Sequence, residues 1–139
     1  MEKFIKGLNK LCYTLDDKYN INSGGCAFVA MCIANELEKR HEKFRVMLYQ
    51  SSEFGNNFDK FKKSSSCTHV AIFYKNTIIN NCGIPPYSIR SYYRKSIKVT
   101  ASELSNYYIN STWNSYYETK HNSEVSRAIT TYFNKNYTK

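Results

Sequence analysis

Apolar positions along the chain recur at two spacings, and each spacing predicts a different kind of element. Three stretches have apolar side chains three or four residues apart, which is typical of amphipathic helices. We therefore expect helices over residues 2–14, from Cys26 to about residue 42, and from Asn122 onward. In the last helix, the side facing the core should carry Val125, Ala128, Ile129, Tyr132 and Phe133.

Stretches rich in β-branched and aromatic residues predict strands at 44–49, 69–74, 77–82 and 97–99. The second and third should form a hairpin with a tight turn at either Lys75-Asn76 or Asn76-Thr77. Thr100 and Glu103 have the spacing of a capping box, so another helix is expected from there to about Tyr108. Residues 50–66 are polar and are expected to form a loop. Because no repeat or linker divides the sequence, we expect one α+β domain over residues 1–139.

Composition adds expectations about partners and location. The 13 Tyr and 8 Phe supply apolar surface for one core, and the formal net charge of +9 would attract an acidic protein or nucleic acid. The five cysteines, with no Cys-x-x-C pair and no apolar signal segment at the start, favour a reducing, cytoplasmic location. No stretch approaches the roughly 20 apolar residues of a membrane span. The abundance of Lys, Asn, Tyr and Ile suggests AT-rich coding, as in a bacterium, phage or virus.

Cys26 has the surroundings of a reactive thiol. It follows Ser23-Gly24-Gly25 and begins a predicted helix, where unpaired backbone N–H groups and the helix dipole stabilise a thiolate. The two glycines leave room for a substrate backbone to approach. The same N–H groups can stabilise an oxyanion, so Cys26 is the candidate nucleophile.

His69 is the candidate base, because it begins a predicted strand after a polar loop. A third group should orient its imidazole. With a two-residue turn, Asn80 lies diagonally across the hairpin from His69, within side-chain reach. A three-residue turn would bring Asn81 to that face instead. We favour Asn80 and keep Asn81 as the alternative.

Two segments resemble the papain-like cysteine peptidase superfamily, which includes NlpC/P60 and transglutaminase-like variants. The segment Ser23-Gly24-Gly25-Cys26-Ala27-Phe28-Val29-Ala30 resembles the helix that carries the nucleophile, and residues 68–80 resemble the histidine hairpin. The order Cys, His, Asn is that of the superfamily. The resemblance implies a nucleophile helix packed on a small antiparallel sheet, with further C-terminal helices. It also implies an oxyanion donor upstream of the cysteine, for which Asn20 and Asn22 are the candidates.

The activity implied by this resemblance is acyl transfer through a thioester. A thiolate–imidazolium pair of Cys26 and His69 would attack an amide or ester carbonyl of a protein or peptide. Hydrolysis of the thioester gives a peptidase, amidase or deamidase, and capture by an amine gives a transglutaminase-type reaction. No cofactor and no metal are expected for this chemistry.

Two other interpretations are open at this stage. Convergence of Cys26, Cys67, His69 and Cys82 would instead make a tetrahedral metal site. A catalytically inactive papain-like domain, or a basic, aromatic-rich binding protein for nucleic acid or an acidic partner, is the second alternative.

Overall fold

A computed structural model of the protein describes residues 1–21, 25–50, 67–80, 93–110 and 119–139. The loop was predicted over residues 50–66; Gln50 instead ends a strand, and the rest of that segment lies outside these ranges. The helices are α1 (Glu2–Tyr19), α2 (Cys26–Lys39), α4 (Ala101–Asn110), the short 3₁₀ helix η2 (Thr119–His121) and α5 (Asn122–Asn136). The strands are β1 (Arg45–Gln50), β2 (Cys67–Tyr74), β3 (Thr77–Ile79) and β4 (Tyr93–Ile97). The expected combination of helices with a small antiparallel sheet is confirmed.

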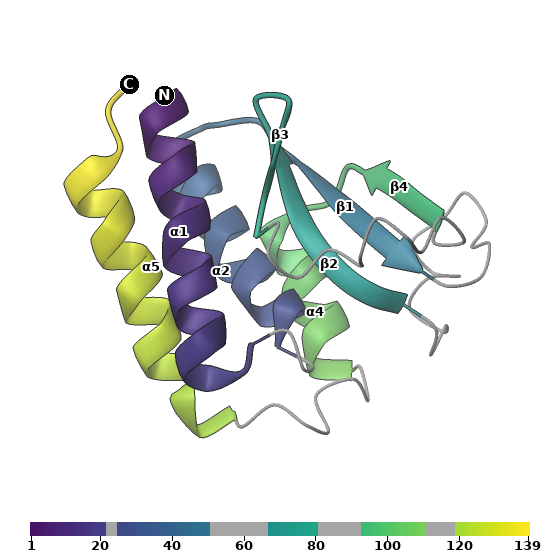
Figure 1. The fold of residues 1–139 in the computed structure, drawn as a ribbon. Helices are drawn as coiled ribbons and strands as arrows, with labels where there is room; N and C mark the ends of the chain where they lie inside the picture. The colour runs from purple at the N-terminus through teal and green to yellow at the C-terminus, as the bar shows by residue number, and fades with distance from the viewer. Residues whose placement is uncertain (22–24, 51–66, 81–92, 111–118) are drawn as a thin grey trace.

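The four strands form one sheet in the order β3-β2-β1-β4, and each neighbouring pair is antiparallel (Figure 1). The hairpin turn consists of Lys75 and Asn76, both with positive φ (48° and 61°), as in the turns that suit the twist of paired strands. Tyr74 therefore pairs with Thr77 and Ile72 with Ile79, which is the register expected from a two-residue turn.

The hydrophobic core lies between the sheet and α2. Because strand residues alternate between faces, one face of the sheet presents a connected apolar set to the helices. Its members are Val46, Leu48, Val70, Ile72, Tyr74 and Ile79, all almost fully buried. Helix α2 packs against β2, α4 and α5, and α1 lies beside α5 and the edge strand β3 (Figure 1). In α1, the absent side chain of Gly7 leaves room for Tyr132, whose hydroxyl donates to the carbonyl of Phe4 at 2.7 Å.

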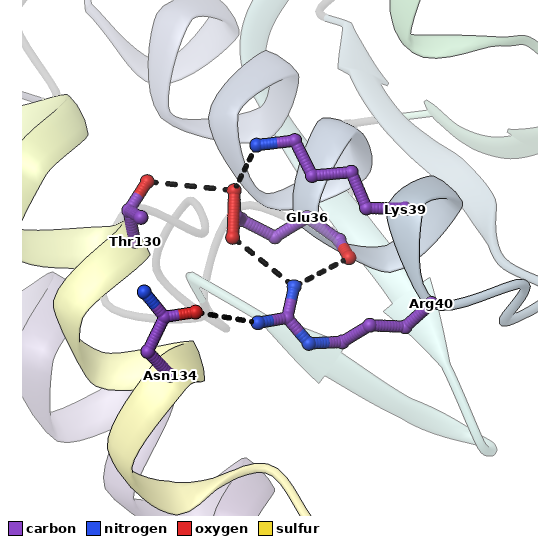
Figure 2. A network of polar contacts seen from close by, with 5 residues as sticks. All are labelled: Glu36, Lys39, Arg40, Thr130 and Asn134. Carbon is purple, nitrogen blue, oxygen red and sulfur yellow. Dashed lines mark hydrogen bonds and ion pairs between the residues drawn. The ribbon is translucent and has the colours of Figure 1, made fainter.

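A polar network fastens the C-terminal end of α2 to α5 (Figure 2). Glu36 is buried and accepts from Lys39 at 3.0 Å and from the Arg40 guanidinium at 3.1 Å. Arg40 also donates to the Asn134 side chain at 3.0 Å, and Thr130 donates to Glu36 at 3.4 Å. The same guanidinium stacks over Phe133 of α5 and over Tyr137, the residue that follows this helix. The charge of Glu36 is thus neutralised where it is removed from water.

Several predicted boundaries were wrong. Helix α1 continues past residue 14 to Tyr19, because Leu15 and Tyr19 extend its buried stripe beyond the polar pair Asp16-Asp17. Helix α2 ends at Lys39 rather than near 42, where the chain turns through His41 at a φ of 58°.

The last two strands also differ from the prediction. Strand β4 covers 93–97 rather than 97–99, because its position follows from pairing with β1, a contact far away in the sequence. Strand β3 stops at Ile79 instead of continuing to residue 82, since Asn80 leaves the extended conformation. Among the described helices, none has the length and apolar character needed to cross a membrane.

Candidate active site

Cys26 is the first residue of α2, as the sequence predicts, and its side chain is turned inward with 1% exposed. The sulfur lies within hydrogen-bonding reach of the backbone N–H groups of Cys26, Ala27 and Val70. The first two belong to the first turn of α2, where N–H groups have no partner within the helix. The third belongs to β2, so the thiol meets the sheet one residue beyond His69.

The surroundings of the sulfur have opposing effects on its proton. Burial raises the pKa of Cys26 to about 11, because a thiolate would be poorly solvated there. The three backbone N–H groups lower the pKa, and the negative charge of Asp16 raises it. Burial is the largest of these effects, so the resting group is a neutral thiol.

His69 lies near the start of β2 and is fully buried. It pairs across the sheet with Tyr49 of β1, and the two rings lie 6.0 Å apart between centroids. The Nε2 atom of His69 is 2.9 Å from the backbone carbonyl oxygen of Asn80. A carbonyl oxygen can only accept, so Nε2 carries the proton and donates it. In the neutral ring, Nδ1 is then the basic nitrogen.

The imidazole is neutral in the resting site. Burial lowers the pKa of His69 to about 4, whereas the Asn80 carbonyl and the charge of Asp16 raise it. The raised pKa of the Cys26 thiol and the lowered pKa of the His69 imidazole both oppose the standing thiolate–imidazolium pair expected from the sequence. The charge of Asp16, near the end of α1, acts on both groups.

The hairpin brings Asn80 into contact with His69, but through a different atom from the one predicted. The sequence argument expects the Asn80 side chain to reach His69, whereas the observed contact is made by the backbone carbonyl. The reason is local: Asn80 has a φ of 69°, so the chain turns and its carbonyl is directed at the ring. Asparagine adopts this left-handed conformation more readily than most residues.

The predicted oxyanion donors stay a prediction, because the structure describes only one of them. Asn20 is exposed and ends α1 in a left-handed conformation, with its N–H bonded to the carbonyl of Asp16 at 2.7 Å. The structure thus gives its backbone a helix-capping role. Asn22 and the alternative orienting residue Asn81 lie outside the described residues.

Sequence reasoning missed one residue at this site, Asn9 of α1. Its side-chain amide donates to the carbonyl of Ile78 at 3.0 Å, and its oxygen accepts from the N–H of Asn80 at 2.7 Å. A polar residue among the apolar positions of a helix was the available signal, because Asn is unfavourable in helix interiors without a specific partner. Its partner is 71 positions away, so the sequence pattern does not reveal it.

The rival metal site is only partly covered by the structure. Cys82 lies outside the described residues, and among those described no group of three or more His, Cys, Asp or Glu side chains is arranged to hold a metal ion. A cavity of about 750 Å³ lies at the other end of the sheet, beside the hairpin turn and the start of α4. Its lining includes Phe44, Phe73 and Lys98 but neither Cys26 nor His69, so it is separate from the candidate active site.

Comparisons with protein-family models, with curated proteins and with solved structures gave no match to this chain. The papain-like interpretation therefore depends on the residues and geometry of this chain alone.

Proposed function

We propose that this chain is a cysteine-dependent hydrolase of proteins or peptides, with Cys26 as nucleophile and Nδ1 of His69 as its base. One observation carries the proposal: the Cys26 thiol meets the N–H of Val70, the residue that follows His69 in β2, and Nε2 of His69 is bonded to the Asn80 carbonyl. That bond makes Nδ1 the basic nitrogen of the ring. The papain-like fold itself is part of this proposal.

The reaction starts from two neutral groups rather than from an ion pair. As the Cys26 sulfur bonds to the substrate carbonyl carbon, its proton passes to Nδ1 of His69. The imidazolium then gives this proton to the departing amine or alcohol as the carbon–nitrogen or carbon–oxygen bond breaks. Water hydrolyses the resulting thioester, whereas capture by an amine would make the outcome transglutaminase-like. Backbone N–H groups around the sulfur stabilise the negative charge as it develops.

The energy of this proton transfer is compatible with a working enzyme. The pKa of about 11 for Cys26 and about 4 for His69 differ by about seven units. Transfer in the resting site is therefore unfavourable by roughly 10 kcal/mol, at about 1.4 kcal/mol per unit. A turnover of about one per second corresponds to a barrier of roughly 17 kcal/mol. The remaining several kcal/mol are available for bond formation, and the effect of the Asp16 charge is already contained in both pKa values.

Cys32 provides a matched control within the same chain. It lies less than two turns further along α2 and is 8% exposed, and burial likewise raises its pKa to about 11. Burial alone therefore predicts that iodoacetamide reacts with Cys32 at least as fast as with Cys26, which is 1% exposed. Assistance by His69 predicts the opposite order.

The test is iodoacetamide labelling near neutral pH, followed residue by residue with mass spectrometry. We expect Cys26 to react about tenfold or more faster than Cys32, and His69→Ala to remove that advantage without slowing Cys32. His41→Ala, at an exposed histidine, is the control substitution. Faster labelling of Cys32, or equal effects of His69→Ala and His41→Ala, would contradict the proposal.

The raised thiol pKa and lowered imidazole pKa favour one alternative, a domain of this shape that binds without catalysis. The formal charge of +9 would then attract nucleic acid or an acidic protein partner. In that case Cys26 shows no His69-dependent labelling, and any salt-dependent binding of an acidic partner survives Cys26→Ala.

A further inference from the structure

Asn9 completes the hydrogen bonding of a sheet edge. Strand β3 is the outermost of the described strands, so none of these strands pairs with its outer N–H and C=O groups. The Asn9 amide bonds to the Ile78 carbonyl and to the Asn80 N–H, two groups two residues apart along the chain. A side-chain amide has the donor and acceptor of a peptide group, so Asn9 takes the place of one residue of a missing strand.

Asn80 is held from two directions as a result. Its N–H donates to Asn9 and its carbonyl accepts from Nε2 of His69 at 2.9 Å. The residue is 1% exposed and left-handed, a conformation that costs free energy unless its surroundings maintain it. The hydrogen bond to Asn9 helps to keep Asn80 in this conformation, on the side of the residue that faces α1.

We propose that Asn9 is a positioning residue, which holds the Asn80 backbone so that its carbonyl fixes His69 in the tautomer with the proton on Nε2. Its catalytic meaning rests on the proposed function, because only that tautomer presents Nδ1 as the base for Cys26. The positioning of Asn80 and the tautomer of His69 can be observed without any substrate. Asn9 acts through Asn80 and has no direct part in bond breaking.

The test is nitrogen-15 NMR of the histidine rings in the full chain, which reports the protonated nitrogen of each neutral imidazole. The chain has three histidines, so His41 and His121 act as internal references. Asn9→Ala removes both bonds, whereas Asn9→Asp keeps an acceptor for the Asn80 N–H. Lys10→Ala, at the next, exposed position of α1, is the matched control.

We expect His69 to be protonated at Nε2 in the unmodified protein and in Lys10→Ala, and to become a mixture of tautomers in Asn9→Ala. Asn9→Asp should retain the original tautomer. This variant also keeps the proposal testable if Asn9→Ala fails to fold. Labelling of Cys26 by iodoacetamide should fall about tenfold in Asn9→Ala and remain unchanged in Lys10→Ala.

The outcomes separate this inference from the proposed function. An unchanged His69 tautomer in Asn9→Ala, or its loss in Asn9→Asp, would overturn the positioning role even if Cys26 still shows His69-dependent labelling. Conversely, a changed tautomer in Asn9→Ala supports the positioning role even if Cys26 never reacts faster than Cys32, in which case the hydrolase proposal alone fails.

Discussion

Asn80 links α1 and β2 through its backbone. Its N–H bonds to Asn9 of α1, its carbonyl bonds to His69 of β2, and its φ of 69° directs these two groups to their partners. A backbone carbonyl stays at this position whatever the side chain is, provided that the left-handed conformation is retained. The residue type therefore matters mainly through its conformational preference.

Substitutions at Asn80 distinguish the backbone carbonyl from the side-chain amide. Asn80→Gly readily adopts positive φ, so it should lower stability through lost side-chain packing yet keep His69-dependent labelling of Cys26 within about threefold. Asn80→Val should cost roughly 1–3 kcal/mol of strain and reduce labelling about tenfold or more, because a β-branched residue strongly disfavours this conformation. Labelling by mass spectrometry and urea unfolding measure both effects. If the two variants lose labelling equally, the side chain is the orienting group, as the sequence argument expects.

At the scale of elements, the attachment of α5 to α2 depends on Arg40 more than on Lys39. Both cations pair with Glu36, but the Arg40 side chain is 18% exposed and that of Lys39 57%. Arg40 also bonds to Asn134 and stacks on Phe133. An exposed ion pair is weak because water screens it, whereas a sheltered one leaves its partner uncompensated when it is broken.

Truncation of each cation should show this difference. Arg40→Ala removes the sheltered pair and the stacking contact, so we expect a loss of roughly 2–4 kcal/mol in the free energy of unfolding. Lys39→Ala is the control on the same helix and should cost less than about 1 kcal/mol. Urea unfolding at neutral pH measures both. Equal losses would mean that the network of Figure 2 contributes little to holding α5 against α2.

Elements defined by neighbouring residues were predictable from the sequence. The capping box is confirmed, since Glu103 N–H donates to the Thr100 hydroxyl at 3.1 Å and Thr100 N–H to the Glu103 carboxylate at 3.0 Å. The hairpin turn and its register also follow from local chemistry. In contrast, the position of β4 depends on pairing with β1, and the bonds of Asn9 reach across 69 and 71 positions. Such contacts leave no periodic signal in a single sequence.

The candidate site was predictable to the same extent. The start of α2 at Cys26 and the hairpin face of Asn80 follow from local patterns. The depth of burial around Cys26 and His69 depends on how α1, α2 and the sheet come together, so the neutral charge state was not predictable from spacing. Sequence reasoning identified candidate residues better than the atoms and protonation states involved.

At the scale of the whole molecule, closing the core removes an ionisable ring from water. His69 belongs to β2, and its surroundings include Tyr49 of β1, Asn80 after β3 and Asp16 of α1. Folding of all these elements is therefore coupled to the charge of one imidazole. The protein should accordingly lose stability in mild acid, before its carboxyl groups take up protons.

The sign of this effect follows from the lowered pKa of His69, about 4 in the folded protein against 6.5 for an ordinary histidine, with burial as the main cause. Below about pH 6.5 His69 binds a proton in the unfolded chain but not in the folded one, so the free energy of unfolding falls as the pH falls. At about 1.4 kcal/mol per unit, the loss should be roughly 2 kcal/mol between about pH 6.5 and 5. Urea unfolding across this range should show that loss in the unmodified protein and in His41→Gln, but little of it in His69→Gln. A loss in His69→Gln as large as in the unmodified protein would show that His69 is able to charge within the folded molecule, and the argument for a neutral thiol–imidazole pair would then fail with it.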